Sequence, residues 1–349
     1  MNLKNMYINF NFSKDFLLLG LEDGYEIYKL VPFELKIKNE LNKSVGIIDI
    51  LNNTNILVFS GNKKNGYCNL NTFVLYDDNE KKDIGKISCE SNILNLKITD
   101  KYVLVVLIDK VMIYNLNLKL LHFIETGINL EGIIGMNYND NELKYSLLSK
   151  LKGNIIIGND NIFSKREIKV HNNIVNNICY NSNGSILATS SKKGTIIRLF
   201  SVNNDYIKIK ELRRGSTLTR IINMNFNIDS NIFLCSTING TIHLFNTGLN
   251  NELNHLENKK LKYIPNIINN LPNNQLTKYF KSEWSFSKFQ IDNIIFILTI
   301  FQDNFIYTIS NDGKFYKLLL KENGNIEIVN IIFFAEKYIS PFNHIKNNN

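Results

Sequence analysis

The stretch Glu211–Ser216, ELRRGS, places two arginines side by side in a strand-like segment, followed at once by a glycine. A guanidinium group carries five N–H donors in a planar fork and binds phosphate oxygens in pairs, so arginine suits phosphate recognition. Successive side chains of a strand point to opposite faces. If this stretch is a strand, Arg213 and Arg214 reach different places, and one pair can serve two anion sites.

The elements that would position these arginines are strands. Short runs rich in Ile, Val, Leu, Phe and Tyr recur along the chain between turns of Asn, Asp, Gly and Lys, while helical periodicity is nearly absent. The fold class is therefore all-β. A unit of strand, polar turn and strand is clearest in SKDFLLLGLEDGYEIYKL from Ser13, SNGSILATSSKKGTIIRLFSV from Ser182, DSNIFLCSTINGTIHLFNT from Asp229 and QDNFIYTISNDGKFYKLLL from Gln302. Their turns close on Gly24, Gly194, Gly240 and Gly313.

Weaker copies at 52–77, 98–117 and 142–159 bring the count to seven, at the spacing of about 40–45 residues expected of a four-stranded blade. The sequence predicts a single seven-bladed β-propeller over residues 1–349. Its N-terminal strand is expected to complete the last blade, beside residues 293–333. The Trp-Asp dipeptide typical of WD repeats is missing, and Trp284 is the only tryptophan, so these are divergent repeats.

One insertion interrupts the repeat, at residues 246–281. Four apolar residues in it follow the spacing of one face of a short helix, and a cluster of lysines comes just before them. The helix positions are Ile264, Ile267, Ile268 and Leu271, and the lysines are Lys259, Lys260 and Lys262. Long insertions in compact domains are usually functional or disordered. This one is therefore a candidate contact loop.

Charge and cysteine usage restrict the class of protein. The formal net charge of +8 and the pI near 9.0 favour an anionic partner: nucleic acid, phospholipid or phosphorylated protein. The four scattered cysteines form no C-x-x-C pair and indicate reduced thiols in the cytosol. The first 19 residues lack the pattern of a signal peptide, and the longest apolar run, Ile294–Phe301, is too short to span a bilayer. Any membrane contact should be peripheral.

The segment GTIIRLF at Gly194–Phe200, followed by RRG at Arg213–Gly215, resembles the PROPPIN family, seven-bladed propellers that bind phosphoinositides in autophagy. Other segments are similar to the family in the same order: IINMNF and TIHLF, SEWSFSKFQI after the insertion, EDGYEIYKL near the start and LLHFIETGINLEGI from Leu120. The resemblance covers nearly the whole chain. The usual family motif is Phe-Arg-Arg-Gly, and here Leu212 replaces the phenylalanine.

The resemblance implies two lipid-binding sites. The first would consist of His171, Thr189, Ser191, Gly194, Thr195, Arg198 and Arg213. The second would consist of Arg214, Thr237, Thr241 and His243. The expected ligand is phosphatidylinositol 3-phosphate or the 3,5-bisphosphate. The resemblance also implies that the blade-six insertion enters the bilayer, through Tyr263, Ile264, Ile267, Ile268 and Leu271.

The expected setting is the cytoplasm, on autophagosomal, endosomal or vacuolar membranes, with autophagy or membrane-traffic proteins as partners and a monomer in solution. Family members that bind a lipid-transfer partner often carry Pro-Arg in the blade-two loop. The aligned stretch NKKNGYCNLNTFVLYD from Asn62 lacks both residues, so that partner is not implied here.

The sequence leaves several alternatives open. The histidines, serines and threonines of both sites are also typical of residues that satisfy turn backbone in any propeller. The insertion is also compatible with Asn-rich disorder or with packing on the propeller's flank. A protein-binding WD scaffold without lipid binding is the main rival function. The chain contains no recognisable catalytic motif and no clustered metal ligands, so we expect no enzyme, cofactor or metal. Its dispersed charges argue against nucleic acid.

Overall fold

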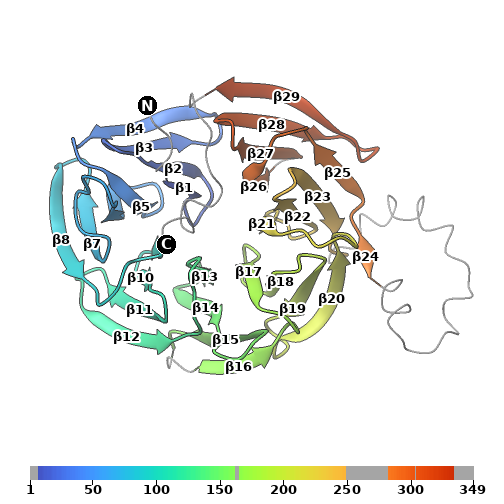
Figure 1. Ribbon diagram of the computed structural model, residues 1–349, viewed down its shortest axis with the longest axis horizontal. Helices are drawn as coiled ribbons and strands as arrows, with labels where there is room; N and C mark the ends of the chain where they lie inside the picture. The colour runs from blue at the N-terminus through green and yellow to red at the C-terminus, as the bar shows by residue number, and fades with distance from the viewer. Residues whose placement is uncertain (1–6, 162–164, 249–281, 303, 334–349) are drawn as a thin grey trace, which may run out of the picture.

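A computed structural model describes residues 7–161, 165–248, 282–302 and 304–333. These residues form seven sheets, antiparallel except for one short parallel pairing, arranged as blades around a central axis (Figure 1). Within the described residues no helix is long and apolar enough to cross a membrane. The predicted all-β fold with seven blades is confirmed.

The blades follow one another in chain order. Blades one and two comprise β1 (Tyr7–Phe10), β2 (Phe16–Gly20), β3 (Gly24–Lys29), β4 (Glu34–Glu40), β5 (Val45–Ile50), β6 (Ile56–Gly61), β7 (Thr72–Asp77) and β8 (Lys82–Ser88). Blades three and four comprise β9 (Asn95–Ile98), β10 (Tyr102–Val106), β11 (Lys110–Asn115), β12 (Leu120–Glu125), β13 (Ile134–Asn139), β14 (Glu142–Leu148), β15 (Asn154–Asn159) and β16 (Lys165–Lys169).

The remaining three blades lie nearer the C-terminus. Blade five comprises β17 (Val175–Tyr180), β18 (Ile186–Ser191), β19 (Ile196–Ser201), β20 (Ile207–Arg213) and the short β24 (Glu283–Trp284). Blade six comprises β21 (Ile221–Phe226), β22 (Ile232–Thr237), β23 (Thr241–Asn246) and β25 (Ser287–Gln290). Blade seven comprises β26 (Phe296–Gln302), β27 (Phe305–Ser310), β28 (Lys314–Leu320) and β29 (Ile326–Phe333).

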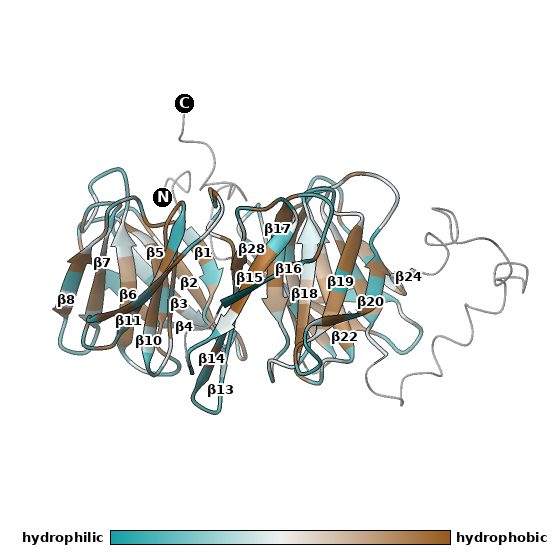
Figure 2. Ribbon diagram, turned by 90° about the horizontal axis from the view of Figure 1, so that it is seen from below, coloured by the Kyte–Doolittle hydropathy of each residue, from teal (hydrophilic) through white to brown (hydrophobic). Residues whose placement is uncertain are grey.

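Burial explains the sequence pattern of the blades. A middle strand such as β2 is packed on both faces and is a continuous apolar run, whereas an outermost strand such as β4 alternates exposed and partly buried residues. Figure 2 shows apolar residues along the strands and hydrophilic residues at the turns on both sides of the ring. Apolar clusters between blades hold neighbouring sheets together, and one of them joins blades five and six through Leu212, Phe226, Phe233 and Phe245.

The ring closes between blades seven and one by side-chain packing. Phe33 stacks on Phe315 with ring centroids 4.0 Å apart, within a larger apolar cluster drawn from both blades. The expectation that the N-terminal strand completes the last blade is wrong for the described residues: β1 pairs with β2, inside blade one. The reason is that β29 already supplies the fourth strand of blade seven from its own part of the chain.

The insertion falls between the third and fourth strands of blade six, because β23 precedes it and β25 follows it. The helix and the contact residues predicted within Tyr263–Leu271 lie outside the described residues. The first residues described after it form β24, which leaves blade six to pair, in parallel, with the end of β20 in blade five. The residues described at both ends of the insertion therefore contact β20, because Asn246, at its start, accepts from Lys210 at 3.1 Å.

The turn glycine of blade five is required by backbone geometry. Gly194 has a φ of +61°, and a Cβ there would lie 1.9 Å from the carbonyl oxygen of Thr219. Gly240 is equally constrained in blade six, at +76° and 1.9 Å from the oxygen of Ile294. Gly215, in the Arg-Arg-Gly motif, has no atom within 4 Å of its Cβ position. The motif glycine is therefore not needed for packing.

We expect Gly194→Ala to lower the free energy of unfolding by at least about 1–3 kcal/mol, because alanine meets both an unfavourable φ and a backbone oxygen. Gly215→Ala should stay within about 0.5 kcal/mol of the wild type. Thermal and urea denaturation of the two variants measure this difference. Equal stability of both would contradict this account of the turn.

Candidate functional site

Two buried arginines end the outer strand of blade five. Arg213 lies opposite Ile196 in the β19–β20 ladder, and the main-chain N–H of Arg214 donates to the carbonyl of Thr195 at 3.0 Å. Only 9% of Arg213 and 5% of Arg214 is exposed. Because arginine is rarely so buried unless its donors are satisfied, both side chains have defined surroundings.

The two side chains have different neighbours. Arg213 turns toward β24, where its Nη2 donates to Ser282 Oγ at 3.4 Å and its Cζ lies 6.0 Å from the centre of the Trp284 ring. Arg214 turns to the connection that leads into blade six. Its Nε donates to the carbonyl of Gly194 at 2.8 Å. The pair diverges, as the alternation of side chains along a strand predicts.

The surroundings of Arg214 are neutral. Its Nη2 donates to the carbonyls of Thr217 at 2.6 Å and Thr219 at 3.4 Å, so within the described residues its hydrogen bonds go to main-chain oxygens and to no carboxylate. Burial lowers the pKa of Arg214 from its usual value. A guanidinium this basic still keeps its proton at pH 7. Arg214 is thus a buried cation without an anionic partner among the described residues.

A row of polar side chains crosses blade five on the face that carries Arg213. Thr189, Arg198 and Glu211 are consecutive cross-strand neighbours on β18, β19 and β20. His171, from the connection before the blade, lies with its Nε2 3.0 Å from Thr189 Oγ1, and Arg198 Nη1 donates to the carbonyl of Val170 at 2.7 Å. The structure therefore brings His171, Thr189 and Arg198 together.

The row contains an acidic residue that sequence reasoning missed. Glu211 Oε2 lies 3.5 Å from Arg198 Nε, and Lys208 donates to its other oxygen. Burial alone would raise the pKa of Glu211, but Lys208 and Arg198 outweigh it and hold the pKa below its usual value. The available signal was its position two residues before Arg213, which puts both on one strand face.

Turn residues grouped with Arg213 in the prediction also contact Arg214 through their main chain. Ser191, Gly194 and Thr195 belong to the β18–β19 turn, in which the N–H of Gly194 donates to the carbonyl of Ser191 at 2.8 Å. The carbonyls of Gly194 and Thr195 both accept from Arg214. Two residues grouped with Arg213 from the sequence thus contact Arg214.

Apart from Arg214, the residues predicted for the second site lie on blade six. Thr237 Oγ1 is 3.3 Å from both the N–H and the carbonyl of Thr241, so this hydroxyl closes the β22–β23 turn. Thr241 Oγ1 donates to Gln290 Oε1 at 3.0 Å. His243 lies beside Lys288, its partner on β25, and its Nδ1 is 3.3 Å from Ser285 Oγ. Lys288 is an exposed cation that sequence reasoning missed.

Both histidines are neutral at pH 7. Burial, and then the charge of Arg198, lowers the pKa of His171 to about 4. Burial, then Lys288 and Arg214, lowers the pKa of His243 to about 3. The arginines and Lys288, rather than the histidines, therefore supply the positive charge, and the imidazoles can take part only as neutral hydrogen-bonding groups.

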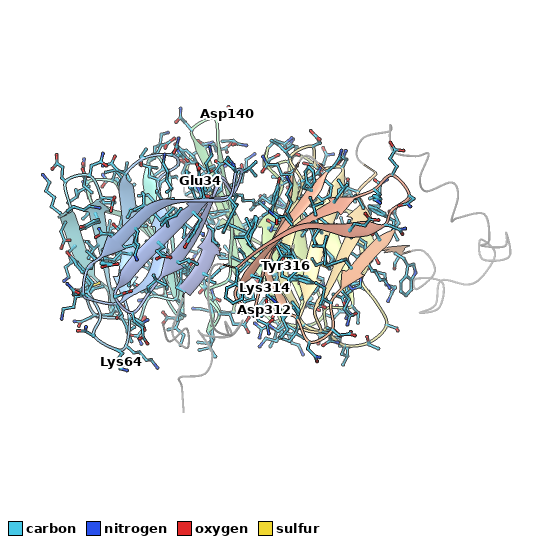
Figure 3. All side chains as sticks on the ribbon, turned by 90° about the horizontal axis from the view of Figure 1, so that it is seen from above. Glu34, Lys64, Asp140, Asp312, Lys314 and Tyr316 are labelled. Atoms are coloured by element: carbon cyan, nitrogen blue, oxygen red, sulfur yellow. The ribbon has the colours of Figure 1, made fainter. Side chains whose placement is uncertain are left out.

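The corresponding turn of blade seven lacks this basic character. Asp312 lies in an ion pair with Lys314 at 2.7 Å and accepts from Ser310 (Figure 3). The blade-five turn instead places Lys192 and Lys193 between Ser191 and Gly194. The turn of blade five is therefore more basic than the turn of blade seven.

Two further predictions concern the blade-two loop and metal binding. The blade-two loop, residues 62–71, contains no Pro-Arg pair and is held by Ser44, whose hydroxyl donates to the carbonyl of Lys64 and which bridges to Gly66. Among the residues that the structure describes, no group of three or more His, Cys, Asp or Glu could hold a metal ion.

Comparisons with known proteins relate the chain to one family. It is 27% identical over 240 residues to SVP1-like protein 2 of Neurospora crassa, covering 68% of this chain and 55% of that protein. It is 28% identical over 297 residues to Autophagy-related protein 18 of Scheffersomyces stipitis, covering 73% and 52%. The chain thus spans about half the length of these curated relatives.

The fold is also shared with a solved structure. Hsv2 of Kluyveromyces lactis superposes with a TM-score of 0.73 at 21% identity, over 94% of this chain and 99% of that chain. The sequence model of the PROPPIN family matches residues 6–267, which include blades one to five and most of the described part of blade six. This chain, a seven-bladed propeller with an Arg-Arg-Gly motif at the end of blade five, belongs to the PROPPIN family.

Proposed function

We propose that this protein is a non-catalytic phosphoinositide effector that binds phosphatidylinositol 3-phosphate or the 3,5-bisphosphate at two sites beside Arg213 and Arg214. The observation that carries the proposal is the pair of buried, diverging guanidinium groups at one strand end. Arg214 in particular donates to neutral carbonyls, so its charge is available to an anion. A headgroup phosphate carries close to two negative charges at neutral pH.

The first site uses the face of blade five that carries Arg213. Arg198 and Arg213 supply charge, the hydroxyl of Thr189 and neutral His171 supply hydrogen bonds, and Ser191 adds a hydroxyl at the turn. Charge-assisted bonds from guanidinium to phosphate are roughly twice as strong as neutral ones. Glu211 competes with the ligand, because its carboxylate forms an ion pair with Arg198.

The second site lies between blades five and six. Arg214 supplies the buried charge, Lys288 an exposed one, and neutral His243 a hydrogen-bonding nitrogen. Thr241 contributes its hydroxyl at the turn. Two headgroup sites on one edge act together on a membrane, and their combined affinity exceeds that of one site by roughly 10²-fold or more when both can engage at once.

The insertion provides the apolar part of the membrane contact. We propose that Tyr263, Ile264, Ile267, Ile268 and Leu271 enter the interface, each buried methylene contributing about 0.8 kcal/mol. The position of the insertion supports this, since the residue after it, Ser282, lies beside Arg213. Headgroup contacts would select the membrane, and the insertion would prolong the attachment.

The biological role follows from the family and from its relative named as autophagy-related. The protein would act in the cytoplasm, as a monomer that docks edge-on to autophagosomal, endosomal or vacuolar membranes. There it would recruit autophagy or vesicle-traffic proteins. The blade-two loop lacks the Pro-Arg pair, so we propose no lipid-transfer partner at that loop.

A protein-binding scaffold is the second candidate. A cleft of about 660 Å³ between blades three, four and five is rimmed by the exposed side chains of Ile128, Leu151 and Ile174. Exposed apolar residues around a hollow are typical of protein contacts. This candidate requires that membrane association survive the loss of both arginines.

Sedimentation with liposomes that each contain one phosphoinositide tests the proposed function. The wild-type chain should sediment with 3-phosphorylated lipids above its level with phosphatidylserine of equal charge. Doubling the salt should weaken binding without abolishing the preference, because buried charges are screened less than exposed ones. Sedimentation that depends only on total lipid charge would overturn the proposal.

Glu211→Gln should strengthen binding to phosphatidylinositol 3-phosphate liposomes by roughly two- to fivefold at low salt, since the change removes a carboxylate that competes for Arg198. Glu327→Gln, an exposed ion-pair partner on blade seven, makes the same charge change away from the site and serves as the control. Weaker binding by Glu211→Gln would mean that Glu211 instead holds Arg198 in place for the ligand.

A further inference from the structure

The segment Ser282–Ser285 contacts one residue of each proposed site, Arg213 of the first and His243 of the second. Ser282 Oγ accepts from Arg213 Nη2 at 3.4 Å, and Ser285 Oγ lies 3.3 Å from His243 Nδ1. Between them, β24 pairs with Leu212 and Arg213, and Glu283 forms an ion pair with Lys210 of β20 at 2.5 Å. Four consecutive residues therefore bridge blades five and six at the outer rim of the ring (Figure 1).

Trp284 occupies an unusual position in this segment. It is the only tryptophan of the chain, and 43% of it is exposed, whereas aromatic residues such as Phe233 and Phe245 are fully buried within blade six. Its ring centre lies 6.0 Å from Arg213 Cζ, within the range of a cation–π contact. The indole therefore rests on a proposed ligand residue and not in an apolar core.

This contact is compatible with phosphate binding by Arg213. The N–H donors of a guanidinium point outward in its own plane, so a ring can cover its face while its edges bind an anion. The strand that carries the indole, β24, lies at the outer rim of the ring (Figure 1). Tryptophan partitions favourably into the membrane–water interface, because its ring is apolar and its N–H is polar.

We propose that Trp284 is an interfacial anchor: on a phosphoinositide membrane its indole enters the headgroup layer beside the lipid held by Arg213. This inference rests on the proposed function and adds to it a membrane-contacting residue that belongs to the propeller itself. The partner is a lipid surface, and a free headgroup would not reproduce the contact.

The single tryptophan makes the proposal directly measurable. Trp284 emission should shift to shorter wavelength, and its quenching by acrylamide should fall at least twofold, when vesicles with phosphatidylinositol 3-phosphate are added. Vesicles of phosphatidylcholine alone, and soluble inositol 1,3-bisphosphate, should leave the emission unchanged. An equal shift with the soluble headgroup would place the indole in the headgroup pocket and overturn the interfacial assignment.

Binding of variants provides the second measurement. Trp284→Ala should weaken sedimentation with phosphatidylinositol 3-phosphate vesicles about five- to tenfold, and Trp284→Phe should recover most of the loss because phenylalanine retains an apolar ring. If wild type binds these vesicles but Trp284→Ala binds equally well and the emission is unshifted, the anchor is overturned while the proposed function stands. If wild type binds no phosphoinositide vesicle, both are overturned.

Discussion

Arg213→Thr/Arg214→Thr is expected to lower the affinity for liposomes with phosphatidylinositol 3-phosphate by about 100-fold or more. The change removes a principal cation from each of the two proposed sites at once. It therefore removes the direct phosphate contacts and also the gain from engaging two lipids together. Sedimentation across a range of lipid concentrations measures the loss.

Folding has to be separated from binding in this variant. Arg214 donates to the carbonyls of Gly194, Thr217 and Thr219, and leaving buried carbonyls unsatisfied costs about 1–3 kcal/mol. The melting temperature of the double variant should therefore fall, while its circular dichroism at 25 °C stays that of a propeller. Arg213→Thr alone leaves those carbonyls satisfied and should still lose most of the binding to the first site.

A matched control removes the same charge elsewhere. Lys165→Thr/Arg166→Thr takes two cations from the exposed outer strand of blade four, where Arg166 forms an ion pair with Asp205. If this control loses as much binding as the double arginine variant, net charge and not the motif governs association. If neither variant loses binding, the scaffold function replaces the proposed one.

The sequence predicts the ring and the divergence of the two arginines for physical reasons. Blade strands are short apolar runs between glycine turns, and turns such as Gly194 require a φ that few other residues adopt. The opposite directions of Arg213 and Arg214 follow from strand alternation alone. Both features are local, so they are visible without knowledge of the tertiary structure.

Features that depend on contacts between distant parts of the chain cannot be predicted from local sequence. That β24 leaves blade six to cover Arg213 depends on where a long insertion returns, and no local pattern around Trp284 specifies it. The pairing of Glu211 with Arg198, and of His243 with Lys288, depends on cross-strand register. The pairing of β1 was predicted wrongly for the same reason, because the sheet that a terminal strand joins is set by tertiary contacts and not by its own residues.

Acidification should destabilise the protein through the two site histidines. The pKa of His171 is about 4 and that of His243 about 3 in the folded chain, against about 6.5 when unfolded. As the pH falls below 6.5, the histidines of the unfolded chain bind protons but those of the folded chain do not, so the free energy of unfolding decreases. By pH 5 the decrease is roughly 2 kcal/mol for each histidine.

Asp49 acts in the opposite direction. Burial raises its pKa to about 6, partly offset by Lys97, so the folded chain binds a proton before the unfolded chain does. Between pH 7 and pH 5 this adds roughly 1 kcal/mol of stability. The net change expected from the three groups is a loss of about 3 kcal/mol.

In His171→Gln/His243→Gln only Asp49 of these three groups remains. The free energy of unfolding contributed by these groups should therefore rise, and not fall, between pH 7 and pH 5. The variant loses hydrogen bonds to Thr189 and Ser285, so its stability at pH 7 falls, and the informative quantity is the difference between pH 7 and pH 5. Urea denaturation at both pH values measures that difference. Thr189→Val removes the partner hydroxyl but keeps the histidine, and should retain a wild-type pH dependence. If the double histidine variant keeps the wild-type pH dependence of stability, both imidazoles accept protons in the folded chain as readily as in the unfolded chain. The proposed sites would then gain positive charge in mild acid.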